Sequence, residues 1–120
     1  MANINVLIEE FIQNVKFANE PINYADKQAV KKHNAATDKY RKTAKKISDE
    51  TSGVPNQFLI LLRSSDENVS IACAVCIIEL MKHTGDQYQL AVSAIEKYVK
   101  TSKNKINVMG FEIYLKNLKK

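Results

Sequence analysis

The sequence predicts an all-α domain of about six helices in three antiparallel pairs. Apolar side chains recur at spacings of three and four residues along most of the chain, which is the period of an amphipathic helix. Only three glycines and two prolines occur in 120 residues, too few for the frequent turns of a β-sandwich or barrel. Hydrophobic residues make up 45% of the chain and charged residues 26%, which is typical of one globular domain.

The first two predicted helices cover residues 5–20 and 24–50. Pro21 is expected to end the first, because a residue that precedes proline is disfavoured in the helical conformation. The second carries eight Lys or Arg residues against four acidic ones. Gly53 is its expected C-cap. Its expected inner stripe, unusually polar for a core face, is Val30, Asn34, Thr37, Tyr40, Ala44 and Ile47.

The third predicted helix covers residues 55–63, and the fourth, residues 67–83, is expected to form the centre of the protein. Taken alone, the five consecutive apolar residues from Phe58 to Leu62 could form a buried strand, but the helical segments around them favour a short buried helix. Asp66 is expected to cap the fourth by accepting hydrogen bonds from its free backbone N–H groups. Residues 71–78 are apolar without a break, and a helix that is apolar on all sides is buried between neighbours.

The last two predicted helices fall within residues 86–119 and are joined by a polar link over 101–104. Asp86 is the expected N-cap of the fifth helix. The sixth carries apolar residues three or four positions apart, namely Val108, Phe111, Leu115 and Leu118. We expect a single domain over residues 1–120, with an N-terminal capping hairpin over 1–52 and two repeat-like helix pairs over 54–84 and 86–119.

The two cysteines, Cys73 and Cys76, are predicted to be core residues. A structural zinc site needs four ligands, and the sequence has no second Cys/His pair at a suitable spacing. Because the cysteines lie within an apolar helical run, they are expected to behave as small hydrophobic residues. His33 and His83 also lack a companion at metal-ligand spacing. We therefore expect no metal and no cofactor.

Neither a secretion signal nor a membrane span is evident. The longest apolar run, Ile71 to Ile78, has eight residues, whereas a bilayer-spanning helix needs about 20. A cytoplasmic protein without membrane contact is therefore expected. No nucleophile elbow, phosphate loop or dinucleotide fingerprint occurs, and the adjacent Glu9 and Glu10 point to different sides of a helix. We accordingly expect no enzymatic activity.

The segment from Leu61 to Ile77 resembles a HEAT-like motif. In such motifs a leucine pair closes the first helix, an aspartate caps the second, and small residues pack between the two. The matching residues here are Leu61, Leu62, Asp66, Cys73 and Ala74. Ser70 departs from the motif, because HEAT repeats often have arginine at this position. The resemblance implies an armadillo-like α-solenoid, a right-handed stack of helix pairs.

Nearly the whole chain is similar to a family of small bacterial proteins that have a HEAT-like helical fold and no assigned activity. The similarity rests on residues 34–38 in the second helix, the segment just described, and Gly110, Leu115 and Lys116 in the last helix. This resemblance implies a fold. By analogy with some small HEAT-like proteins, it also implies a partner or immunity protein of a bacterial toxin.

The first function that this fold favours is protein–protein interaction through the concave face. Asn34 and Asp38 are four residues apart and share a helix face, with Tyr40 close by. They would form a polar pocket for an unknown protein partner. The alternative is an interhelical hydrogen-bond network in which Asp38 pairs with Lys42. Both a monomer and a small homo-oligomer are compatible with the sequence.

The second function that the sequence favours is weak, mainly non-specific nucleic-acid binding. Residues 24–50 have a net charge of +4 and residues 97–120 a net charge of +6, in a chain of net charge +5. In a right-handed stack, second helices of successive pairs line one concave surface, which would suit a phosphate backbone. A solvated, lysine-rich surface is the alternative. The expected phosphate contacts are Lys31, Lys32, Lys39, Arg41, Lys42, Lys45, Lys46, Lys103, Lys105 and Lys116.

Overall fold

The computed structural model describes residues 3–21 and 23–118, and its regular secondary structure there is entirely helical. The all-α prediction is therefore confirmed for this part of the chain. A short 3₁₀ helix, η1, follows α3 directly. The helices in chain order are α1 (Ile4–Ala18), α2 (Lys27–Thr51), α3 (Asn56–Leu59), η1 (Ile60–Arg63), α4 (Glu67–Leu80), α5 (Gly85–Thr101) and α6 (Lys105–Leu118).

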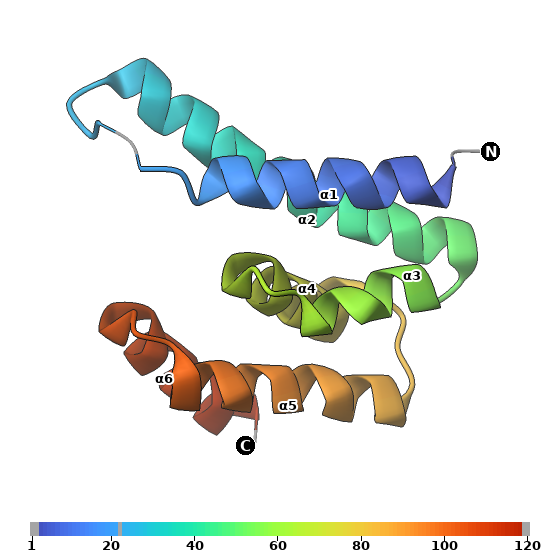
Figure 1. Ribbon diagram of the computed structural model, residues 1–120. Coiled ribbons are helices and arrows are strands. Elements are labelled where there is room, and N and C mark those ends of the chain that lie inside the picture. Colours follow the sequence, from blue (N-terminus) through green and yellow to red (C-terminus); the bar gives the residue numbers. More distant parts are fainter. Residues whose placement is uncertain (1–2, 22, 119–120) are drawn as a thin grey trace.

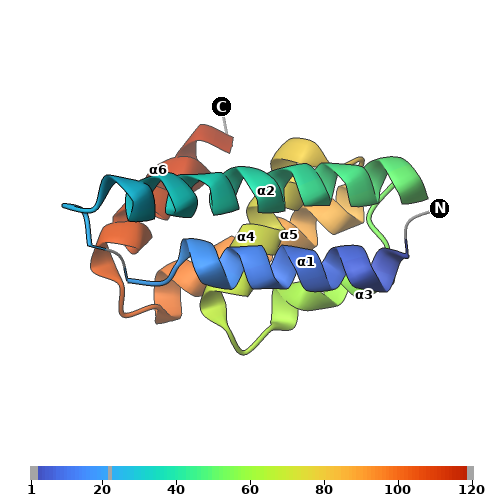
Figure 2. The same cartoon turned by 90° about the horizontal axis from the view of Figure 1, so that it is seen from above.

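The helices lie in three layers (Figure 1). The first layer is α1 and α2, the second is α3, η1 and α4, and the third is α5 and α6. Seen from above, α1 and α2 run side by side in opposite directions (Figure 2). The helix α4 contacts α1, α2 and α5, so it occupies the centre, as its unbroken apolar run predicts.

Two phenylalanines join the first layer to the second. Phe11 of α1 and Phe58 of α3 are completely buried, and their ring centroids lie 4.8 Å apart in an edge-to-face arrangement. The ring of Tyr40 on α2 meets Phe11 in the same manner at 5.5 Å. From α4, Cys73 and Cys76 are both completely buried, which confirms them as core residues. The core is therefore continuous from α1 through to α4.

Two helix ends are set by residues other than the predicted ones. The fifth helix is capped by Thr84, because its hydroxyl accepts from the backbone N–H of Gln87 at 3.1 Å. The Gln87 side chain in turn accepts from the Thr84 backbone N–H at 3.0 Å. Asp86, the predicted cap, lies inside the first turn. At the end of α2, Ser52 adopts the left-handed conformation (φ 59°) in place of Gly53.

The helix α4 ends at Leu80, three residues before its predicted end. Met81 is already extended, and the backbone N–H of Lys82 donates to the hydroxyl of Ser48 on α2 at 2.8 Å. Ser48 is itself buried. The chain leaves the helix early because this contact ties residues 81–82 to the first layer.

The apolar run from Phe58 to Leu62 is only partly buried. Phe58 points into the core, but the side chain of Ile60 is 67% exposed. The prediction of a buried helix is therefore wrong for Ile60. The physical reason is that a segment of two short helices packs against its neighbours along one side only.

Candidate functional site

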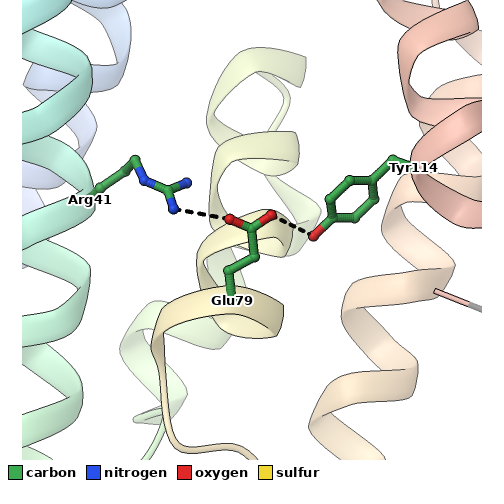
Figure 3. A network of polar contacts seen from close by, with 3 residues as sticks. All are labelled: Arg41, Glu79 and Tyr114. Carbon is green, nitrogen blue, oxygen red and sulfur yellow. Dashed lines mark hydrogen bonds and ion pairs between the residues drawn. The ribbon is translucent and has the colours of Figure 1, made fainter. Parts of the chain in front are cut away.

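A polar cluster joins the second helices of all three layers (Figure 3). Glu79 of α4 lies at its centre. One carboxylate oxygen of Glu79 accepts from the guanidinium of Arg41 on α2 at 2.9 Å, and the other accepts from the hydroxyl of Tyr114 on α6 at 2.9 Å. The side of α2, α4 and α6 that carries these three residues is called the shared face below.

The electrostatics of the cluster favour a structural role, in which it positions the three helices relative to one another. The Arg41 and Glu79 side chains are each 35% exposed, so solvent screens much of their attraction. Burial raises the pKa of Tyr114 above its ordinary value, and its hydrogen bond to Glu79 raises it further. The hydrogen bond to Glu79 also raises the pKa of Arg41. With both carboxylate oxygens engaged, the cluster connects α2, α4 and α6.

Replacing Tyr114 with phenylalanine tests the contribution of this cluster to stability. We expect the free energy of unfolding to fall by about 0.5–1.5 kcal/mol, because a hydrogen bond to a carboxylate is lost while the ring stays packed beside Phe111. Urea unfolding followed by circular dichroism measures the change. The matched control is Tyr24→Phe, since Tyr24 is 80% exposed. Equal effects of the two substitutions would contradict a stabilising role for the cluster.

The structure separates the three residues of the predicted polar pocket. Asn34 and Asp38 are exposed. Asn34 precedes Arg41 by two helical turns, and Asp38 precedes it by three residues, so both lie on the shared-face side of α2. Tyr40 instead packs on Phe11, and burial raises its pKa. Tyr40 is therefore half-buried against the core of the first layer, whereas Asn34 and Asp38 are the exposed members of the predicted pocket.

The alternative interpretation, an interhelical hydrogen-bond network of Asn34 and Asp38 with Asp38 paired to Lys42, is wrong for these residues. Both side chains face solvent, and neither takes part in a side-chain hydrogen bond or ion pair within residues 3–21 and 23–118. Asn34 is likewise wrong as a member of the inner stripe. The interhelical network exists, but Arg41 supplies the α2 side of it. The sequence places Arg41 on the same stripe, because it follows Asn34 by seven residues, but this spacing does not identify its partners on α4 and α6.

The basic residues of α2 and α6 do not converge on one face. On α6, Lys116 follows Tyr114 by two residues and Lys105 precedes it by nine, so both point about 180° away from Tyr114. Lys103 precedes the helix altogether. Arg41 is engaged by Glu79. The remaining predicted phosphate contacts, all exposed on α2, are Lys31, Lys32, Lys39, Lys42, Lys45 and Lys46.

The histidines and acidic residues do not assemble a metal site in the part of the chain that is described. No group of three or more His, Cys, Asp or Glu residues there could hold a metal ion. The Nδ1 atom of His83 lies 2.8 Å from the carbonyl oxygen of Ile77 and 3.0 Å from that of Met81. The His83 ring stacks on the ring of Tyr88, with the two ring centroids 5.6 Å apart. His83 therefore satisfies free carbonyl groups at the end of α4.

No family model, curated protein or solved structure matches this chain. Among the described residues, no helix is long and apolar enough to cross a membrane.

Proposed function

We propose that this chain is a non-enzymatic, HEAT-like module that binds another protein through the shared face of α2, α4 and α6. The proposal includes a right-handed stack of the three helix pairs, in which this face is concave. The observation that carries it is the cluster of Arg41, Glu79 and Tyr114, which connects three helices far apart in sequence. A role as partner or immunity protein of a toxin is the specific form that the analogy favours.

Two physical features make the shared face suitable for a protein partner. The cluster fixes its side chains before binding, so less side-chain entropy is lost when a partner docks. Beside it, Asn34 and Asp38 are exposed and have no side-chain partners within the described residues, so their polar groups are free to pair across an interface. Val75 is half-buried and lies one helical turn before Glu79, so it adds apolar surface on the α4 part of this face.

Affinity capture from native lysate, performed after nuclease treatment, tests this proposal. The bait is the tagged wild-type chain or one of two variants, Asp38→Arg on the shared face and Glu50→Arg. Glu50 follows Arg41 by nine residues and points to the opposite side of α2. Both substitutions change the charge equally. We expect wild type and Glu50→Arg to retain the same protein and Asp38→Arg to lose it. Retention by all three baits would contradict the shared face as the binding surface.

Nucleic-acid binding is the second candidate function, and the exposed lysines of α2 favour it. None of these six side chains forms an ion pair within the described residues, so their charges are available to phosphate groups. Lysine makes phosphate contacts as a point charge, without the bidentate geometry of arginine. The expected binding is therefore weak and independent of base sequence.

A salt titration tests this second candidate. The affinity for a labelled DNA duplex is measured by fluorescence anisotropy between about 50 and 200 mM salt. Contact with several phosphates releases counterions, so the affinity should fall by about 10-fold or more over this range. An affinity that does not change with salt would contradict phosphate binding by α2. Lys39→Glu together with Lys46→Glu should weaken binding, whereas Lys105→Glu on α6 is the control.

A further inference from the structure

A groove of about 640 Å³ lies between α3, η1 and α5. Its floor is apolar and includes Leu59, Ala94 and Tyr98. Its rim is also apolar, since it includes Ile60, which is 67% exposed, and Leu90, which is 47% exposed. In Figure 1, α3 and α5 belong to adjacent layers, and none of the residues of the Arg41–Glu79–Tyr114 cluster lines the groove. It is a different surface from the shared face.

The walls of the groove have the shape that receives a helix. Along α5 the lining residues recur every three or four positions from Leu90 to Thr101, a helical ridge of about 16 Å. On the opposite wall, Asn56, Ile60 and Arg63 have the same spacing. Side chains of a third helix can interdigitate between two such ridges. The groove therefore has the length of about three helical turns.

The charges on the walls specify the chemistry of the occupant. Arg63 on η1 and Lys97 on α5 are exposed, and neither forms an ion pair within residues 3–21 and 23–118. Among the described residues that line the groove, Glu67 is the only acidic one, and it accepts a hydrogen bond from the hydroxyl of Ser102 at 3.2 Å. Two free cations on opposite walls of an apolar groove favour a partner that presents carboxylates on both sides of an apolar stripe.

We propose that this groove binds an amphipathic helix of another protein, one that carries a continuous apolar stripe flanked by Asp or Glu. The site is independent of the proposed role of the shared face. It exists because α3 and η1 bury only part of their apolar run and leave Ile60 beside Leu90 on α5.

A second copy of this chain fits the groove less well. The exposed apolar stripe of α6 contains Ile106, Met109 and Ile113. Beside it lie Lys105 and Lys116, which would meet the cations of the groove, and one acidic residue, Glu112, so this side of α6 is more basic than acidic.

The outer side of α1 is acidic but lacks a continuous apolar stripe. Its exposed apolar residues, Val6 and Phe17, are three turns apart, with Glu10 and Gln13 between them. An acidic helix from a different protein matches both the shape and the charge of the groove.

Titration with labelled synthetic helices tests the proposal. The probe is a fluorescent peptide of about 14 residues with leucines at i, i+3, i+4 and i+7 and glutamates beside them, and its counterpart has lysines in place of the glutamates. Fluorescence anisotropy against the full chain gives both affinities. The variants are Arg63→Glu combined with Lys97→Glu, the groove variant Ile60→Ser, and the control Lys100→Glu, whose side chain does not line the groove. Circular dichroism verifies that each variant is folded.

We expect saturable binding of the glutamate peptide and at least about 10-fold weaker binding of the lysine peptide. The double charge reversal should invert this preference, and Ile60→Ser should weaken both peptides. Lys100→Glu should change either affinity by less than about twofold. Absence of saturable binding, or binding of the glutamate peptide that the double reversal leaves unchanged, would overturn the proposal. A wild-type dimer in light scattering that Ile60→Ser dissociates would also overturn it, because the groove would then hold a second copy.

Discussion

Replacing Phe11 with alanine is expected to lower the free energy of unfolding by about 3–5 kcal/mol. The Phe11 side chain is completely buried and makes edge-to-face contacts with Phe58 and Tyr40. Its removal leaves a cavity where α1, α2 and α3 meet, and these helices cannot all close onto it. A domain of this size is stable by roughly 6–18 kcal/mol, so the loss is a large share of the total.

Urea unfolding of Phe11→Ala and of Phe17→Ala measures this effect with a matched control. Phe17 lies on the same helix and loses the same atoms, but its side chain is 43% exposed. The control substitution should therefore lower the free energy of unfolding much less than the core substitution, by on the order of 1 kcal/mol. Similar losses for the two variants would contradict a core centred on Phe11.

Stability is also expected to fall steeply as the pH rises from about 9 to about 12, because over this range the thiols ionise in the unfolded chain while burial keeps them protonated in the folded chain. Burial raises the pKa of Cys76 to about 12, and it raises the pKa of Cys73 as well. Since these pKa values are higher in the folded chain, the thiol protons stabilise it fully below the unfolded pKa, near 9. That stabilisation is lost as the pH approaches the folded value. Three pKa units correspond to about 4 kcal/mol for Cys76, as an order of magnitude.

The raised pKa values of Tyr40 and Tyr114 act in the same direction once the pH exceeds the ordinary tyrosine pKa of 10.0. Urea unfolding at a series of pH values between about 8 and 11 measures the slope, and Cys76→Ala identifies its source. The variant should be less stable near pH 8 because of its cavity, but it should lose stability more slowly on raising the pH. A variant with the same slope as wild type would show that the Cys76 thiol does not ionise on unfolding.

The centre of the fold was predictable from the sequence, because burial alone determines it. The helix over residues 71–78 is apolar on every side, and exposing any side to water is unfavourable, so α4 must lie between other helices. Helix ends were less predictable, because several residues near each end can act as caps. Thr84 and Asp86 are both suitable for α5. The choice of Thr84 depends on Gln87, whose side chain also donates to the carbonyl oxygen of Val54 at 3.2 Å.

The polar cluster could not be predicted, because its residues are far apart in the sequence. Glu79 lies 38 residues from Arg41 and 35 from Tyr114. Only the register of α2 and α6 against α4 brings them together, and no local pattern encodes that register. Arg41 was expected to contact phosphate, because no local pattern shows that Glu79 engages its guanidinium. The exposure of Ile60 was also not predictable, because an apolar run does not show which of its residues the neighbouring helices leave exposed.

Site-specific photocrosslinking in native lysate tests most directly whether the shared face binds a protein. A photoreactive phenylalanine analogue replaces Asn34, on the shared-face side of α2, or Glu50, on the other side of the same helix. After nuclease treatment and illumination, we predict one discrete crosslinked species from the Asn34 position and none from the Glu50 position. A crosslink of equal yield at both positions, or at Glu50 alone, would contradict the shared face as the binding surface.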